Sequence, residues 1–365
     1  MNRPKPLDRL FQDQIEQYLQ HYLQVDYLLL CAPLPNRESY KDVYRTALTE
    51  VLEPIQELAF QPGKRWRPAI TLLHALLPSG AASSSEIFGS GRQSATVANL
   101  AHTQADVFLG TLATLVELLH NATLIADDIE DNAELRRGIP ALHLSYGLDR
   151  ALNACNWAYF LPSALLQPLE RAGSRDWVQD LERLFSRCLS QIHLGQALDI
   201  RWHRQHNYIP TLDEYFCMAT LKTGALFGFS AEAGILLSQV LWPDQAPVPA
   251  GTCRDLWRRI GRIFQALDDM QNIALGSPGK LRGDDWLEGK KSFPICLFVH
   301  EGEDQDRNIR LVNSLMRYLA DSPAPIDLLD EVLETFIDSA RPALFRSLEC
   351  LQKELSDCRL LSRQL

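Results

Sequence analysis

The segment VFLGTLATLVELLHNATLIADDIED, residues 107–131, decides the fold class of this chain. Its long apolar part carries a single charge, Glu117, and it ends in a cluster of acids from Asp127 to Asp131. A bilayer requires about 20 apolar residues, but His120 interrupts this run and the acids close it. A helix that is apolar on nearly all sides is also typical of the core of a large helical protein. We therefore predict a buried helix and no membrane span.

The rest of the chain has the same helical pattern. Apolar residues recur at spacings of three and four over 14–30, 42–58, 177–202 and 328–355. Alternating strand-like runs are almost absent, and no stretch is typical of a linker between domains. The sequence predicts an all-α protein with a single domain over residues 1–365. A flexible loop rich in Ser, Gly and Ala is expected at about 78–92.

Composition excludes several classes of protein. The 365 residues include 46 acidic and 36 basic side chains, and the net charge of -10 argues against a nucleic-acid partner. None of the eight cysteines forms a CxxC pair or a zinc-like cluster with histidine. The amino-terminal residues lack the apolar core of a signal peptide. We expect a cytoplasmic protein with reduced thiols.

The acids that close the first segment indicate chemistry. On a helix, Asp127 and Asp131 lie one turn apart on the same face, where they repel unless a cation lies between them. Carboxylates that leave coordination sites open suit Mg²⁺ bridging to substrate phosphates. Arg136 and Arg137, just beyond, suit anionic oxygens. The alternative is a solvated acidic helix end whose charge the nearby arginines offset.

A second acidic pair, Asp268-Asp269, follows Phe264-Gln265 in another apolar stretch. Basic groups occur in GKRWRP at 63–68, in KTG at 222–224, and at Lys280 and Lys290. Each of these alone is more often a turn or a solvated helix end. Magnesium that bridges an anionic substrate accounts for both signs of charge together.

In these motifs and their order, from about residue 63 to residue 294, the chain resembles the trans-isoprenyl diphosphate synthases of the polyprenyl synthetase family. GKRWRP is similar to the family's isopentenyl-diphosphate loop, and DDIEDNAELRRG to its first aspartate-rich motif. KTG, FQALDDMQN and GKKSFP complete the series. HNATLIADDIEDNAELRRGIPALH and HLGQALDIRWH most resemble eukaryotic-type geranylgeranyl diphosphate synthases. Asn272 stands where the second motif would carry its third acid, as is usual in that subgroup.

The resemblance implies a bundle of antiparallel helices around a central cavity, a homodimer, and a Mg²⁺ cofactor. It implies head-to-tail condensation of isopentenyl diphosphate with an allylic diphosphate. The implied metal ligands are Asp127, Asp131 and Asp268, with Asp269 as a possible addition. The diphosphate of isopentenyl diphosphate would be received by Lys64, Arg67, His120 and Arg137. The allylic diphosphate would be held by Arg136, Lys222, Lys280 and Lys290, with Thr223 and Gln265 beside the reacting carbons, and Gln196 and Asp199 near the same site.

Product length depends on residues near the first motif. Ala122 and Thr123 precede Asp127 by about one turn and are small, so they should not block a farnesyl chain. The resemblance places Tyr159, Phe160 and His193 at the chamber floor, and their bulk indicates geranylgeranyl diphosphate as the product. Ordinary core packing is the alternative for these side chains.

Other activities stay open from the sequence alone. A farnesyl or longer-chain synthase differs only in product length. A class I terpene cyclase shares the fold and the first motif but needs no second diphosphate site, so GKRWRP and the downstream lysines disfavour it. A non-catalytic synthase subunit typically has degraded aspartate motifs, whereas the first motif here is intact.

Overall fold

A computed structural model of the chain describes residues 11–79, 104–171, 175–205, 208–246, 248–276 and 281–362. These residues are almost entirely helical and include one pair of two-residue strands, so the expected all-α class is confirmed for them. The loop expected at about 78–92 lies outside the described residues from position 80 onward. Pro78 and Ser79 belong to a short 3-10 helix instead.

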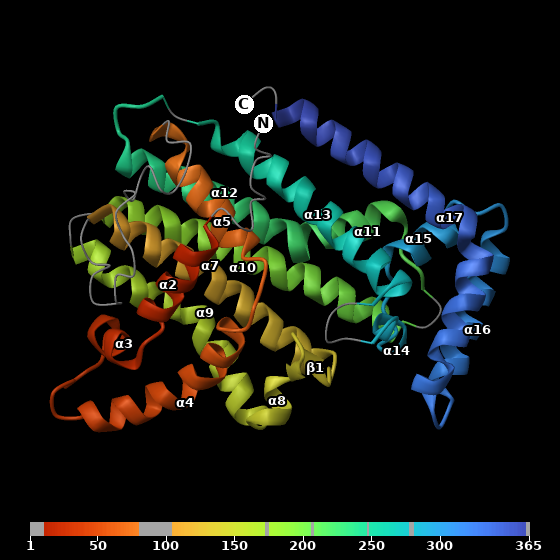
Figure 1. Cartoon of the computed structure of the whole chain (residues 1–365), viewed down its shortest axis with the longest axis horizontal. Coiled ribbons are helices and arrows are strands. Elements are labelled where there is room, and N and C mark those ends of the chain that lie inside the picture. The colour runs from red at the N-terminus through yellow and green to blue at the C-terminus, as the bar shows by residue number, and fades with distance from the viewer. Residues whose placement is uncertain are drawn as a thin grey trace. The chain divides into compact units, whose positions relative to one another are not determined.

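The chain divides into two compact units, whose helices are labelled in Figure 1. Unit 1 comprises residues 1–136, 140–186 and 229–251, and unit 2 comprises residues 137–139, 187–228 and 252–365. The single domain expected from the sequence stays a prediction.

Most elements lie within one of the two units. Unit 1 contains α2 (Gln12–Tyr22), α3 (Val25–Cys31), α4 (Lys41–Ala59), α5 (Trp66–Leu76), η1 (Leu77–Ser79), α7 (Gln104–Glu130), β1 (Leu135–Arg136), α8 (Leu142–Ser145) and α9 (Leu148–Arg171). Unit 2 contains α11 (Leu212–Ala219), η3 (Thr220–Gly224), α13 (Ala250–Ala274), α14 (Asp284–Leu287), α15 (Phe293–His300), α16 (Gln305–Ala320) and α17 (Pro325–Ser362). Three elements contain residues of both units: β2 (Ile139–Pro140), α10 (Arg175–Arg204) and α12 (Ala225–Leu241). The first two residues of α13 also belong to unit 1.

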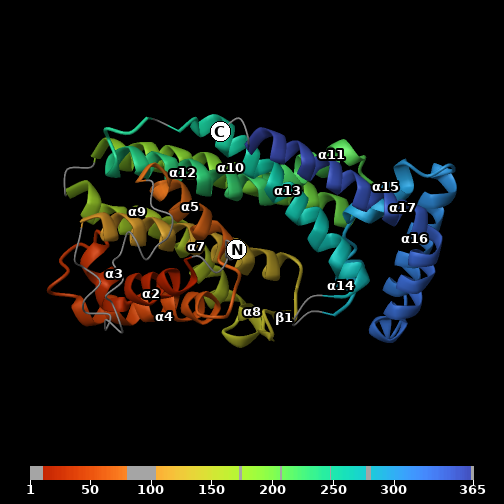
Figure 2. The ribbon, with the colours of Figure 1, turned by 45° about the horizontal axis from the view of Figure 1, so that its top comes forward.

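The central helix of unit 1 is α7, which contacts α2, α4, α5 and α9 and lies beside α9 in Figure 2 as well. Nearly every residue of its apolar part is buried, as expected for a helix covered on most sides. At Gly110 a Cβ atom would lie 2.5 Å from the ring of Tyr22 and 2.7 Å from that of Tyr18. The absence of a side chain there allows α2 to pack against α7.

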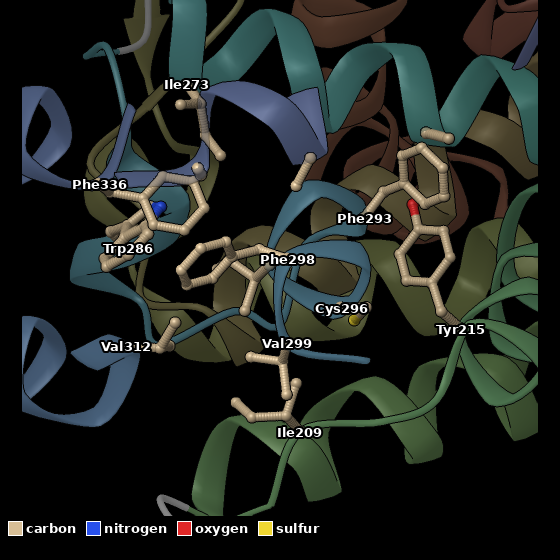
Figure 3. Close-up of a cluster of buried hydrophobic side chains, with 14 of the residues drawn as sticks. Ile209, Tyr215, Ile273, Trp286, Phe293, Cys296, Phe298, Val299, Val312 and Phe336 are labelled. Carbon is tan, nitrogen blue, oxygen red and sulfur yellow. The ribbon is translucent and has the colours of Figure 1, made fainter. Parts of the chain in front are cut away.

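Unit 2 has its own core, shown in Figure 3. The ring of Trp286, from α14, lies 5.0 Å from that of Phe336 on α17, and Phe298 of α15 lies 5.4 Å from Phe336 on another side. Tyr215 and Phe293 pack at 5.4 Å in the same cluster. This core fixes the short helix α14, which has too few residues to be stable alone.

Two helical stretches of the described chain, Gln104–Glu130 and Leu212–Leu241, are long and apolar enough to cross a membrane. The most apolar windows of these stretches are 83% and 72% buried inside the protein. Core helices pass the same test of length and composition, and this extent of burial agrees with the core interpretation made from the sequence.

Candidate active site

The carboxylates predicted from the sequence lie at the end of α7. The main-chain N–H of Asp131 donates to the carbonyl oxygen of Asp127 at 2.9 Å, so the helical turn continues through both residues and their side chains share a face. The guanidinium of Arg136 donates two hydrogen bonds to Oδ1 of Asp128, one of them from Nε at 2.7 Å, and lies 3.5 Å from Oδ2 of Asp127. Asp128 is buried, and Arg136 supplies the positive charge that its burial requires.

The same face of α7 also carries His120, which contacts an arginine of α5. His120, Thr123, Asp127 and Asp131 occur at spacings of three and four residues, which places them in one stripe. Nη1 of Arg67, from α5, lies 3.0 Å from Nε2 of His120. The seven residues from His120 to Asp127 correspond to about 10 Å along the helix axis. The contact between His120 and Arg67 therefore lies about 10 Å along the helix axis from Asp127, which shares with Asp131 the face that carries His120.

Arg65 supports the loop that leads into α5. Its Nε donates to Glu16 at 2.7 Å, its Nη1 to Glu117 at 2.6 Å, and its Nη2 to the carbonyl oxygens of Ala59 and Gln61 at 2.6 and 2.9 Å. Burial lowers the pKa of Arg65, but the two carboxylates outweigh burial and raise it overall. The sequence pattern did not single out Arg65.

That loop also carries Lys64. Its neighbour Arg65 has a left-handed backbone, with a φ of 47°. Lys64 is exposed beside this buried arginine. The short motif GKRWRP gives no signal that separates its buried cation from its exposed one.

In unit 2, Lys222 lies in η3, a five-residue π-helical turn between α11 and α12. Such turns occur frequently at functional sites. Its Nζ donates to Oδ2 of Asp199 at 2.6 Å, and Oδ1 of Asp199 lies 2.8 Å from Nε2 of His203. Burial alone would raise the pKa of Asp199, but Lys222 and His203 hold it well below its usual range. At Gly195 of α10 a Cβ atom would lie 2.4 Å from the main-chain nitrogen of Lys222, so only glycine fits this approach.

A chain of hydrogen bonds links η3 to α13. Oγ1 of Thr223 donates to Oε1 of Gln265 at 2.6 Å, and Nε2 of Gln265 donates to Oδ1 of Asp269 at 2.9 Å. Oδ2 of Asp269 accepts from the hydroxyl of Tyr215 at 2.7 Å and from the main-chain N–H of Phe293 at 2.9 Å. Burial, with the nearby Asp285, raises the pKa of Asp269 to about 7 against the effect of these donors.

The two adjacent acids of α13 thus differ in their surroundings. Asp269 is buried and bonded on both oxygens, whereas Asp268 is exposed. Asp268 is the better placed of the two to meet a cation from solvent.

Two of the remaining predicted diphosphate ligands are described. Lys290 forms ion pairs with Glu288 and, at 3.6 Å, with Asp285. Arg137 and Gly138, with φ values of 53° and 83°, form the centre of the turn between β1 and β2. Such a pair of positive φ values is typical of a type I′ turn. Lys280 lies outside the described residues.

The residues of the predicted chamber floor differ in burial within the single chain. Ala122 is fully buried, and Sγ of Cys155 from α9 lies 3.3 Å from its carbonyl oxygen. Thr123 and Tyr159 are half-buried. Phe160, in contrast, is 76% exposed, and His193 is exposed as well, so neither lines an enclosed chamber within the single chain. Adjacent helical residues point about 100° apart, which agrees with the different burial of Tyr159 and Phe160 in the single chain.

The donor set fits magnesium rather than an all-protein metal site. Among the described residues, no group of three or more His, Cys, Asp or Glu side chains could hold a metal ion. Mg²⁺ commonly binds one or two carboxylates, with water and substrate phosphates as its other ligands. Asp127 and Asp131 on one helical turn supply that minimal set.

Comparison with known proteins adds the family. A model of the polyprenyl synthetase family matches residues 49–320. A geranylgeranyl pyrophosphate synthase of Gibberella zeae is 36% identical over 58% of this chain and 53% of its own length. One of Eremothecium gossypii is 34% identical over 58% of this chain and 70% of its own length. Several curated relatives, that of Gibberella zeae among them, are matched over little more than half of their length.

Solved structures agree on the fold. A crystal structure of a geranylgeranyl pyrophosphate synthase superposes with a TM-score of 0.73 at 20% identity, covering 99% of this chain and 93% of the other. A polyprenyl synthase from Caulobacter crescentus, crystallised with calcium and isoprenyl diphosphate, gives a TM-score of 0.66 at 21% identity, covering 100% and 93%. The expected isoprenoid synthase fold is confirmed. With its motifs in order and most of its length matched, this chain belongs to the polyprenyl synthetase family.

Proposed function

We propose that this chain is a magnesium-dependent trans-prenyltransferase. It condenses isopentenyl diphosphate with an allylic diphosphate, head to tail, to give geranylgeranyl diphosphate. The observation that carries the proposal is the stripe on α7, where the pair of His120 and Arg67 lies about two turns from Asp127 and Asp131. Family membership and the names of the relatives support the same activity.

The cationic residues would divide between two substrates. Lys64, Arg67 and His120 would receive the diphosphate of isopentenyl diphosphate, together with Arg137. Arg136, Lys222, Lys280 and Lys290 would receive the allylic diphosphate. In the structure Arg136, Lys222 and Lys290 form ion pairs with carboxylates. A diphosphate and its metal ions would replace these acids as partners.

Asp127 and Asp131, with Asp268 as a further ligand, would hold magnesium, which when bound would supply positive charge to a departing diphosphate. The allylic carbon becomes cationic as its bond to the diphosphate oxygen breaks. Gln265 is suited to face this charge, because its amide is anchored to Asp269 and its carbonyl oxygen is thereby oriented as an acceptor. The hydroxyl of Thr223 lies beside that oxygen. Oriented dipoles of this kind stabilise developing charge without reorganisation during the reaction.

The deciding experiment incubates the purified chain with isopentenyl diphosphate, farnesyl diphosphate and Mg²⁺, and then separates the products by chromatography. A linear diphosphate one prenyl unit longer supports the proposal. A hydrocarbon indicates a cyclase, and no turnover indicates a non-catalytic subunit. Asp131→Asn should lose about 100-fold in kcat, because a charge-stabilising ligand is removed from the transition state. Glu130→Gln, which changes the exposed acid next to it, is the matched control and should keep activity. Equal activities of the two variants would contradict the metal assignment.

We further propose that the enzyme is a cytoplasmic homodimer. The support for a dimer is the exposure of large apolar side chains along α9, where Leu148, Leu152 and Phe160 are 56%, 45% and 76% exposed. Apolar patches of this kind mark association surfaces. Light scattering after gel filtration should give a dimer for the wild type and a monomer for Phe160→Glu. Phe345→Glu, at a ring that is 65% exposed on α17, is the control and should remain dimeric.

A further inference from the structure

Asn272 lies at the end of the second acidic motif and contacts both ends of the segment that connects α13 to α14. Its side-chain amide donates to Oδ1 of Asp284, the first residue of α14. Its main-chain oxygen accepts from the N–H groups of Gly276 at 3.3 Å and Gly283 at 3.0 Å. A single residue of α13 thus binds the chain where it leaves that helix and where it enters α14.

The position of α14 depends on such anchors. With four residues it cannot form a stable helix by its own backbone bonds. One anchor is Trp286, packed in the core against Phe336 (Figure 3). The other is the carboxylate of Asp284, whose Oδ1 accepts from Asn272 and from its neighbour's main-chain N–H at 3.0 Å. Together they fix both ends of the short helix.

The segment immediately after α14 carries Lys290. The main-chain N–H of Lys290 donates to the carbonyl oxygen of Asp285 at 2.8 Å, and Gly289, at a φ of 80°, donates to that of Trp286 at 3.1 Å. These bonds transmit the position of α14 directly to Lys290. A shift of the first turn of α14 would therefore move this lysine.

The side chain at position 272 must donate a hydrogen bond, because its partner is the carboxylate of Asp284. Asn272 is 5% exposed, and its Oδ1 has no hydrogen-bond partner among the described residues. Its only side-chain bond in the described structure is the one that its nitrogen donates to a carboxylate. An aspartate here would bring two carboxylates within hydrogen-bond distance in a largely buried place, which is unfavourable unless they share a proton.

We propose that Asn272 is a positioning residue that holds α14, and with it Lys290, for substrate binding, rather than a weakened metal ligand. The inference rests on the proposed prenyltransferase activity. This role also explains why an amide occupies the place of the motif's third acid. Asp284 already supplies the acid, so position 272 must supply the donor.

The test compares Asn272→Asp, Asp284→Asn and the exchange Asn272→Asp/Asp284→Asn with the wild type. Asn313→Asp on α16 is a control for the added charge. For Asn272→Asp we expect the KM for the allylic diphosphate to rise about tenfold, kcat to change less, and Tm to fall by about 3 °C. The exchange restores a donor–acceptor pair in the opposite direction and should return both KM and Tm close to wild type. The Mg²⁺ concentration for half-maximal activity should not change.

Two results would overturn the proposal. One is a lower Mg²⁺ requirement in Asn272→Asp that persists in the exchange variant, which would make position 272 a metal site. The other is Asn272→Asp behaving like Asn313→Asp in both KM and Tm. If the wild type forms no prenyl diphosphate, the proposed function fails, and the Tm values of the variants still decide whether the contact between Asn272 and Asp284 holds α14.

Discussion

Replacing Arg65 by methionine tests how the basic loop before α5 is held. The guanidinium is wholly buried and donates to two carboxylates and two carbonyl oxygens. Methionine fills much of the volume but removes every donor. It leaves Glu117, whose side chain is 2% exposed, as a buried charge without the guanidinium at 2.6 Å. Removing one partner of a buried pair costs about 3–5 kcal/mol, a large part of the roughly 5–15 kcal/mol that stabilises a typical domain.

The assay is urea denaturation combined with steady-state kinetics. Arg65→Met should lower the free energy of unfolding by about 3–5 kcal/mol. The double variant Arg65→Met/Glu117→Gln should recover about 2 kcal/mol of this loss, because the buried charge is gone. The KM for isopentenyl diphosphate should rise about tenfold in both variants, because the loop that carries Lys64 has lost its support. The KM for the allylic substrate should stay near wild type.

Two outcomes would refute this reasoning. The first is a double variant no more stable than Arg65→Met, which would mean that Glu117 does not need the guanidinium. The second is equal effects on both KM values, which would mean that the loop serves no particular substrate. Arg45→Met, which removes an exposed arginine paired with Asp26, is the control and should leave the unfolding midpoint unchanged.

Three further results are expected. Lys64→Ala should raise the KM for isopentenyl diphosphate with little change for the allylic substrate, and equal effects in steady-state assays would mean that the two diphosphate sites are wrongly assigned. Ala122→Phe should shift the product toward farnesyl diphosphate, because the fully buried site has no room for a ring. Phe160→Ala should lengthen the product, because the ring that is exposed in the single chain is covered in the proposed dimer, where it would close the chamber; product chromatography that shows an unchanged chain length would remove Phe160 from the floor. Burial lowers the pKa of Lys291 to about 8, below the 10.5 of an ordinary lysine. Below pH 8 the lysine is charged in both the folded and the unfolded state, and its burial lowers the free energy of unfolding by about 3 kcal/mol. This loss of stability disappears as the pH rises toward 10.5. Lys291→Met should therefore have a higher Tm than wild type at pH 7, and calorimetry that shows the same advantage at pH 10 would contradict this.

Local patterns predicted the helical elements that carry the candidate site. The apolar run before Asp127 predicted the buried helix α7, and the four-residue step to Asp131 predicted their shared face. The three-residue step from Gln196 to Asp199 predicted a shared helix face in the same way. Helical periodicity determines these features, so one sequence was sufficient.

Contacts between distant segments were not predictable in this way. Arg65 binds Glu16, 49 residues away, and Glu117, 52 residues away, and no spacing rule connects them. Which of the neighbouring acids Asp268 and Asp269 is buried depends on Tyr215 and the amino end of α15. The exposure of Phe160 in the single chain was not predictable from the resemblance, which named Tyr159 and Phe160 together although helix geometry points adjacent residues about 100° apart.

The π-helical turn at 220–224 makes the site depend on helix register. A π turn accommodates one residue more than an α turn within a continuous helix. Removing one residue from it would restore ordinary α periodicity and rotate the side chains before the turn by about 100° relative to those after it. Lys222 and Thr223 would then no longer meet Asp199 and Gln265 together. Insertions and deletions in this stretch are therefore expected to be far more harmful than substitutions.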